Sequence, residues 1–265
     1  MPSERPSCQT ESERSFELVE RGGREISSAP GPLRLQYPGE EIALNPPIVD
    51  SSLALIILSA GRSTRMGEPK ALLRFGNWTA LELAVRNAAA GGLGRVVVVI
   101  GHRAEEIRAA HTFAGIGVDF SWVLNRAPES EQIESLKIGL KALEKEHLEA
   151  FLFQPVDYPL VTKLDFAALV LAHRAHSGPE RVFIPTYQDR RGHPVLCRAK
   201  MREAILELPP GRTARDALDQ GGIVHVEVPN RGVVEDMNTP DDYRRLREIF
   251  RREQSGQASQ KGRIA

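Results

Sequence analysis

The stretch that decides the fold is LALIILSAGRSTRMGEPK, residues 53–70. It begins with the aliphatic run Leu53–Leu58, which is apolar throughout and therefore indicates a strand buried on both faces of a parallel sheet. The run then breaks into a loop that carries two glycines and three cations, Gly61, Gly67, Arg62, Arg65 and Lys70. Small residues let backbone N–H groups approach an anion, and cationic side chains neutralise it. The stretch therefore predicts a phosphate-binding loop at the end of a buried strand.

The spacing of this loop excludes two common phosphate motifs. A P-loop has four residues between its glycines and then Lys-Ser/Thr, whereas five residues separate Gly61 from Gly67 here, and Glu68-Pro69 follows. The dinucleotide pattern G-x-G-x-x-G is also missing. A strand followed by a plain polar turn is the simpler alternative. A binding role is favoured because open α/β sheets bind their ligands at the ends of strands.

Length and composition favour one large α/β domain with tails. The chain has 265 residues, and 35 basic residues balance 35 acidic ones. A nucleic-acid-binding protein would more often have a basic surplus. Neither a membrane-spanning run nor a secretory signal pattern is present, and Cys8 and Cys197 are too few for a disulfide framework. We therefore expect a cytoplasmic protein with neither nucleic acid nor membrane as partner.

Strands and helices alternate along most of the chain. Apolar strands are predicted at 53–58, 95–100, 118–124, 151–156 and 182–185, and helices at 79–90, up to 110, at 131–145 and at 164–176. This alternation predicts an α/β fold with a doubly wound, mostly parallel, Rossmann-like sheet. Beyond residue 185 the pattern predicts strands at 190–196 and 223–228, short helices at 199–206 and 213–219, and a last helix at 241–252. Such a mixed second half is typical of a lid that selects one ligand over a sheet half that binds another.

Both ends of the chain differ from the middle. Residues 1–50 contain seven of the eighteen prolines, have an acidic excess and show no sustained helical or strand period. They are interpreted as a largely disordered extension. Residues 51–253 are then expected to form the folded domain, and residues 254–265 a disordered polar tail.

The loop also carries a family resemblance. The segment Leu58-Ser59-Ala60-Gly61-x-Ser63-x-Arg65-Met66-Gly67-x-Pro69-Lys70 resembles the signature L-x-A-G-x-S-x-R-M-G-x-x-K of nucleotidyltransferases with a glycosyltransferase-A-like fold. Within these it is most similar to the molybdenum cofactor cytidylyltransferase-like branch. The resemblance implies that Leu58, Ser59, Ala60 and Gly61 bind the nucleotide, with the Ala60-Gly61 backbone around the base. It also implies that Arg65 and Lys70 hold the triphosphate as catalytic residues.

Asp157 follows the apolar strand 151–156 directly. A carboxylate at the carboxyl end of a central strand lies in the crevice where such sheets bind ligands, and Mg²⁺ prefers one or two carboxylates with phosphate oxygens and water. A cap for the helix near Thr162 is the alternative, but Asp157 stands about five residues too early. The family has a D-x-P motif here, which implies that Asp157 binds the catalytic magnesium.

A second metal ligand is implied by the segment Asp236-Met237-Asn238-Thr239-Pro240-Asp241-Asp242-Tyr243, which resembles the family's D-x-D-T-P-E-D-Y. The position that supplies a carboxylate in the family is Asn238 here. Its amide oxygen ligates Mg²⁺ without charge, so either the affinity is lower or Asp236 assists. By itself, the segment indicates only the start of a helix, with Thr239 as its cap.

Asn125 and the segment Ser135-Leu136-Lys137-x-Gly139-Leu140 are similar to the family's N…S-L-x-x-G-L. This similarity implies that Asn125 and Ser135 contact the base and ribose. The glycine that usually precedes the serine is replaced by Glu131, which makes base selection less defined. A plain amphipathic helix explains the apolar positions equally well, so Ser135 alone is informative.

The segment Arg190-Arg191-Gly192-His193-Pro194-Val195-Leu196 is similar to the R-G-H-P-V-L motif of the molybdenum cofactor branch. Its glycine and proline fix a tight turn, so Arg191 and His193 face whatever the turn overhangs. A phosphate-bearing acceptor would suit them, and a purely structural turn is the alternative. Arg215 is expected to add another contact to the acceptor phosphate.

The resemblance implies molybdopterin as acceptor, CTP as nucleotide and Mg²⁺ as cofactor. An acceptor phosphate oxygen attacks the α-phosphorus in line and pyrophosphate leaves, so no His or Cys nucleophile is needed. The methyl group of Ala60 would crowd a purine, and guanylyl enzymes have glycine there. A molybdoenzyme is a further possible partner. The alternatives are a nucleotidyltransferase for a sugar phosphate or phospho-acid, and a relative that acts as an oxidoreductase or as a molybdoenzyme maturation chaperone.

Overall fold

The computed structural model describes residues 33–37, 40–44, 49–127 and 131–262. The strands of its central sheet are β3 (Asp50–Ser59), β6 (Leu93–Ile100), β7 (Asp119–Leu124), β8 (Ala150–Pro155), β9 (Val182–Tyr187), β10 (Arg190–Arg191), β11 (Val195–Arg198) and β12 (Ile223–Glu227). The helices are α1 (Ala80–Ala90), α2 (Ala104–Ala109), α3 (Gln132–Ala142), α4 (Lys163–Ala175), α5 (Met201–Leu206), α6 (Ala214–Leu218) and α7 (Pro240–Gly262). Short 3₁₀ turns cover Lys70–Leu72, Asp219–Gly221 and Arg231–Val234.

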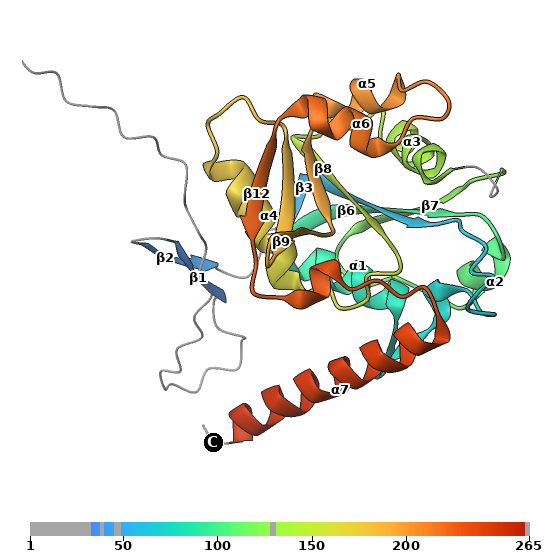
Figure 1. The fold of residues 1–265 in the computed structure, drawn as a ribbon, viewed down its shortest axis with the longest axis vertical. Helices are drawn as coiled ribbons and strands as arrows, with labels where there is room; N and C mark the ends of the chain where they lie inside the picture. Colours follow the sequence, from blue (N-terminus) through green and yellow to red (C-terminus); the bar gives the residue numbers. More distant parts are fainter. Residues whose placement is uncertain (1–32, 38–39, 45–48, 128–130, 263–265) are drawn as a thin grey trace, which may run out of the picture.

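The eight strands form one mixed sheet in the order β10-β9-β11-β8-β3-β6-β7, with β12 paired to β9. The four strands β7, β6, β3 and β8 run parallel, whereas β11 is antiparallel to both β8 and β9. Helices α3, α5 and α6 cover one face, and α1 and α4 cover the other (Figure 1). The predicted α/β class, with a mostly parallel sheet and a mixed second half, is confirmed.

Strand β3 is buried on both faces, as its uninterrupted apolar run predicts. Leu53, Leu55 and Ile57 pack into the cluster that includes α1 and α4. The alternate residues Ala54, Ile56 and Leu58 pack into the cluster that includes α3 and α5. Leu58 pairs with Pro155 in the parallel ladder, so β3 and β8 end side by side. The loop after β3 therefore lies next to the residues that follow β8.

A third apolar cluster joins α7 to a hairpin that sequence analysis did not predict. Strands β4 (Arg74–Phe75) and β5 (Trp78–Thr79) pair in antiparallel, and each is too short to show a period. The buried residues of the cluster are Leu73, Phe75, Ala80, Leu83, Leu160, Met237 and Leu246. Helix α7 continues to Gly262, beyond the predicted end at residue 252. It begins at Pro240 after Thr239, as predicted.

At the amino-terminal end, β1 (Leu33–Tyr37) and β2 (Glu40–Leu44) form a separate antiparallel pair that sequence analysis did not assign. Residues 1–32 of the predicted extension lie outside the described residues, as do 263–265 of the predicted tail. The division of the chain into extension, domain and tail stays a prediction. Among the described helices, none combines the length and apolar character needed to cross a membrane.

Candidate active site

A cleft of about 350 Å³ opens where β3 and β8 end. Its walls come from the loop after β3, the first turns of α3, the segment after β8 and the residues before α7. The predicted site residues that line it are Leu58, Ser59, Ala60, Gly61, Arg65, Lys70, Ser135, Asp157 and Asn238. Segments distant in sequence thus contribute to one cavity, at the position where open α/β sheets bind ligands.

The loop after β3 folds back around Ser63. The carbonyl oxygen of Ser63 accepts hydrogen bonds from the backbone N–H groups of Met66 and Gly67, at 2.9 and 3.2 Å. Its hydroxyl oxygen accepts one from the backbone N–H of Lys70, at 3.3 Å. Gly67 has φ of +76°, a conformation that favours glycine. This tight turn returns Lys70 to the end of β3, while the side chain of Arg65 stays exposed at the cleft.

Lys70 links the two predicted metal ligands. Its ammonium Nζ lies 2.9 Å from Oδ2 of Asp157 and 2.8 Å from Oδ1 of Asn238. Only 16% of the Lys70 side chain and 19% of the Asp157 side chain are exposed, so this ion pair is screened less than a surface pair. Asn238 Nδ2 donates to Oδ2 of Asp236 at 2.5 Å. Asp236 therefore holds the amide with its oxygen turned toward the ammonium.

Asp157 has an unsatisfied oxygen, which matters because buried polar atoms are rarely without partners. Its Oδ1 atom is buried and has no hydrogen-bond partner among the described residues. Burial raises the pKa of Asp157 above its ordinary value, although the Lys70 ammonium acts in the opposite direction. The two Asp157 oxygens and the Asn238 amide oxygen are hard donors of the kind that Mg²⁺ takes. The residues present therefore fit a divalent cation.

Within the described ranges, no three His, Cys, Asp or Glu side chains gather in a way that could hold a metal ion. Mg²⁺ commonly binds through one or two carboxylates and completes its shell with phosphate oxygens and water. A site formed by the Asp157 carboxylate and the uncharged Asn238 amide is consistent with this type of coordination. These two side chains alone could not complete the coordination shell of the ion.

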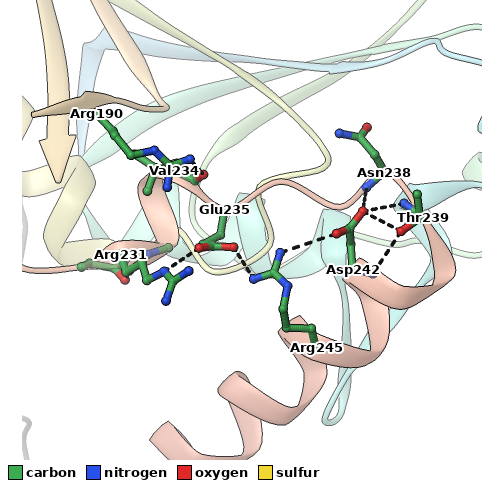
Figure 2. Close-up of polar contacts among 10 residues, drawn as sticks. Arg190, Arg231, Val234, Glu235, Asn238, Thr239, Asp242 and Arg245 are labelled. Carbon is green, nitrogen blue, oxygen red and sulfur yellow. Dashed lines mark hydrogen bonds and ion pairs between the residues drawn. The ribbon is translucent and has the colours of Figure 1, made fainter. Parts of the chain in front are cut away.

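The backbone around Asn238 is fixed from two sides. The N–H of Met237 donates to the carbonyl oxygen of Asp157 at 2.9 Å, which ties the two ligand-bearing segments together. On the other side, Asp242 accepts hydrogen bonds from the N–H groups of Asn238 and Thr239, at 3.1 and 2.8 Å, and from the Thr239 hydroxyl at 2.8 Å (Figure 2). The start of α7 thus anchors Asn238 at the cleft.

Glu235 continues this network away from the cleft. Figure 2 shows its carboxylate between Arg231 and Arg245, with Arg231 Nε at 2.5 Å and Arg245 in direct contact. The side chain is 6% exposed, and the two guanidinium groups hold its pKa below the ordinary value in spite of burial. Arg190 donates to the carbonyl oxygen of Val234 at 3.4 Å. The segment before Asn238 is therefore held by charge as well as by backbone hydrogen bonds.

Asn125 lies behind the cleft wall and contacts Ser135. It is buried, and its Nδ2 donates to the Ser135 hydroxyl oxygen at 3.0 Å. Its Oδ1 accepts from the backbone N–H of Ala127 at 2.9 Å, and its own N–H donates to the carbonyl oxygen of Ile100 at 2.7 Å. Ser135 lines the cleft, whereas Asn125 does not. The geometry gives Asn125 the part of orienting Ser135.

The three predicted acceptor-binding residues lie outside the lining of the cleft. The His193 ring packs against Tyr158 and Phe153, with centroid separations of 4.7 and 6.0 Å. Burial lowers the pKa of His193 to about 4, so the ring is neutral at pH 7 and supplies no positive charge. Arg191 is exposed on β10, 3.7 Å from Asp219, and Arg215 is exposed on α6. Their contacts with an acceptor stay predictions.

Known proteins share the sequence pattern of a large part of this chain. The sequence pattern of the MobA-like NTP transferase domain matches residues 55–226, which span β3 to β12 and include the loop and Asp157. The chain belongs to this family.

Individual relatives of this NTP transferase differ in their named activities. The molybdenum cofactor cytidylyltransferase of Escherichia coli (strain K12) is 26% identical over 76% of this chain and 98% of its own. The nicotine blue oxidoreductase of Paenarthrobacter nicotinovorans is 29% identical over 59% of this chain and 76% of its own. The Rv0371C protein of Mycobacterium tuberculosis H37Rv, solved in complex with manganese, has a TM-score of 0.57 at 22% identity, over 74% of this chain and 98% of its own. The last likeness concerns the fold alone.

This NTP transferase also has a second hollow that sequence analysis missed. It has a volume of about 350 Å³ and shares Leu58 and Gln132 with the first cleft. The rest of its lining is Glu131, Ile133, Leu136, Phe153, Thr213 and Ala214. A sequence signal did exist for Gln132, because it stands three residues before Ser135 and therefore shares a helix face with it. Nothing local marked Phe153 or Thr213, which different elements bring together.

Proposed function

We propose that this NTP transferase moves CMP from CTP to the phosphate of molybdopterin and releases pyrophosphate. The observation that carries the proposal is the cluster of Lys70, Asp157 and Asn238, in which the Lys70 ammonium lies within 2.9 Å of an oxygen of each of the other two, in a cleft that the cationic loop borders. Nucleotidyl transfer needs cations for a triphosphate and oxygens for a metal within reach of the same phosphates. Family membership and the resemblance to a cytidylyltransferase support this choice of reaction.

Asp157 and Asn238 would hold Mg²⁺. When bound, the ion supplies charge stabilisation to the phosphate oxygens of nucleotide and acceptor. Asp236 keeps the Asn238 amide oxygen turned into the cleft through its 2.5 Å hydrogen bond. The backbone bond from Met237 to Asp157 keeps the two ligands at a fixed separation. The protein thereby fixes the positions of the two ligand-bearing residues in advance, and such preorganisation lowers the barrier of a polar reaction.

The nucleotide would bind along the loop. Arg65 and Lys70 neutralise the triphosphate and then the leaving pyrophosphate, while Ser135 contacts the nucleoside and Asn125 orients Ser135. Ala60 is buried at the end of β3, and its methyl group narrows the space for a base. This narrowing favours a pyrimidine and therefore CTP over GTP.

The acceptor would lie on the side of the second hollow. The hollow adjoins the cleft through Leu58 and Gln132. One acceptor molecule could therefore place its phosphate in the cleft and the rest of its structure in the hollow. Its walls are mostly apolar, and the Phe153 ring offers a flat surface for a heterocycle. Arg215 follows the lining residues Thr213 and Ala214 in sequence, which places its backbone near the same hollow. Arg191 and His193 complete the proposed acceptor side.

The test is release of pyrophosphate from CTP, GTP or ATP in the presence of molybdopterin and Mg²⁺. We expect CTP to be the preferred substrate. The Asp157→Asn variant should lose about a thousandfold or more in kcat, by analogy with the loss of a group that stabilises transition-state charge. Asp241→Asn is the matched control, because Asp241 is an exposed carboxylate three residues after Asn238, lies outside the cleft lining and pairs with Arg244. Full activity of Asp157→Asn would refute the metal assignment.

A second candidate activity follows from the oxidoreductase relative. If no NTP yields pyrophosphate with molybdopterin, a sugar phosphate or a phospho-acid, a redox reaction or a role in molybdoenzyme maturation becomes the better proposal. Oxidation of a nicotinamide cofactor, followed by its absorbance, and binding to a molybdoenzyme distinguish these two.

A further inference from the structure

We infer that Lys70 competes with the divalent metal for Asp157 and Asn238, and that the nucleotide relieves this competition. The inference rests on the proposed function, in which these two residues hold the metal. It starts from the ammonium of Lys70, which lies 2.9 Å from Asp157 Oδ2 and 2.8 Å from Asn238 Oδ1. These are ordinary hydrogen-bond distances, and both oxygens belong to the proposed metal-ligand set.

An ammonium and a metal cannot use this oxygen pair together. Mg²⁺ binds oxygens at about 2.0–2.1 Å, whereas the Lys70 nitrogen already occupies the space between the same two oxygens. The two cations would also repel each other strongly at such a separation in a partly buried site, where screening is weak. Asp157 Oδ1 stays open to a metal, but Lys70 must leave before Asp157 Oδ2 and the Asn238 amide oxygen can bind the same ion.

The structure allows that departure. Only the side chain has to move, because the backbone of Lys70 is held independently: its N–H donates to Ser63, and its carbonyl oxygen accepts from Leu73 at 3.2 Å. The ammonium borders the cleft that Arg65 and the loop backbone also line. A triphosphate bound there offers Lys70 a replacement for the Asp157 carboxylate. Without that anion, expulsion of Lys70 would leave a cation beside a metal.

Metal and nucleotide binding are therefore coupled through one side chain. The protein alone binds a divalent metal weakly, and the nucleotide strengthens that binding by drawing Lys70 toward its phosphates. Because linkage is reciprocal, the metal strengthens nucleotide binding by the same factor. The coupling delays formation of the metal site until a nucleotide is present.

The experiment measures binding of Mn²⁺ alone to the full chain by the loss of its free-ion EPR signal. Lys70→Met removes the charge and keeps the length of the side chain, so we expect it to bind Mn²⁺ at least about tenfold more tightly than the parent, a change that corresponds to about 1.4 kcal/mol. Lys70→Arg retains the cation and should bind as weakly as the parent. Arg65→Met is the matched control: it removes a cation from the same cleft that does not contact either oxygen.

The outcomes separate the inference from the proposed function. Equal Mn²⁺ affinity in Lys70→Met and the parent overturns the competition but leaves the metal site in place. If Arg65→Met binds Mn²⁺ more tightly by the same factor, the competition is also overturned, because removal of any positive charge from the cleft would then explain the gain in affinity. Absence of Mn²⁺ binding in every variant, with or without an α,β-methylene analogue of CTP, overturns the metal assignment and the inference with it. Thermal unfolding of each variant with and without Mn²⁺ gives a second readout, in which Lys70→Met alone should gain stability from the metal.

Discussion

Gly192 stands where the backbone of the His193 turn meets the segment that leads to Asn238. A Cβ atom built on Gly192 would lie 2.2 Å from the carbonyl oxygen of Val233 and 2.7 Å from its carbon. Separations under 3.0 Å essentially do not occur for real Cβ atoms, so the two backbones would have to move apart by at least 0.8 Å. The neighbouring hydrogen bond from the His193 N–H to the same oxygen, now 2.9 Å, would then be broken or badly stretched.

The Gly192→Ala variant should therefore lose about 2–4 kcal/mol of unfolding free energy. Overpacking of a tight interior contact costs about 1–3 kcal/mol, and loss of a buried hydrogen bond adds about 1 kcal/mol. Activity should fall as well, since the displaced segment continues into Asp236 and Asn238. Equilibrium unfolding in urea, monitored by circular dichroism, measures the free energy, and pyrophosphate release measures activity.

Gly61→Ala is the matched control for this prediction. A Cβ atom at Gly61 would meet no atom of the described residues within 4 Å, and the φ of Gly61 is not in the left-handed region. Stability should change by less than about 0.5 kcal/mol. Gly61 lines the cleft, so the added methyl group should still weaken nucleotide binding. If Gly192→Ala unfolds at the same urea concentration as Gly61→Ala, the packing argument is refuted.

Three further predictions test other parts of the structure. Asp165 is buried, and burial raises its pKa to about 6 despite hydrogen bonds from Thr162 and Asn230. The folded state then holds a proton that the unfolded state has lost, so stability should fall by about 3 kcal/mol as the pH rises from about 4 to 6. Urea titrations across that range should show a flatter profile for Asp165→Asn, and an identical profile would contradict the assignment. Leu246 is fully buried where α7 meets the third apolar cluster. Leu246→Ala should therefore lower the free energy of unfolding by about 2–5 kcal/mol in the same assay. A loss below about 1 kcal/mol would show that α7 is not anchored there. Ala60→Gly should lower the ratio of kcat/KM for CTP to kcat/KM for GTP about tenfold, because removal of the methyl group leaves more room for a purine. An unchanged ratio would count against Ala60 as the residue that selects the base.

Much of the fold could be predicted because its signals are local. The apolar run at 53–58 predicts a strand buried on both faces, and β3 is packed on both faces. The apolar spacing predicts a helix over 79–90, and α1 begins there with a capping box between Thr79 and Glu82. The two-residue strands β4 and β5 escaped because so few residues carry no period. Helix α7 was predicted too short because its polar end lacks an apolar stripe to mark it.

The candidate site also has parts that the sequence predicts and parts that only the structure shows. The glycines and cations of the loop, and the position of Asp157 after β8, are visible in the sequence because each depends on neighbouring residues only. That His193 would pack as a neutral ring against Tyr158 and Phe153 could not be predicted, since these neighbours come from β8 and the segment after it, distant in sequence. The second hollow was invisible for the same reason: α3, β8 and α6 each contribute part of its wall.

By itself, the sequence determined the order of strands and helices, the phosphate-binding character of the loop and the types of residue available for a metal. Only the tertiary structure decided that Lys70 contacts Asp157 and Asn238, which are 87 and 168 positions away along the chain. Periodicity and turn chemistry act over a few residues, whereas such contacts depend on which strands become neighbours and how helices pack over them. The pairing of Lys70 with the proposed metal ligands could therefore be seen only after the sheet had placed β3, β8 and the start of α7 around one cleft.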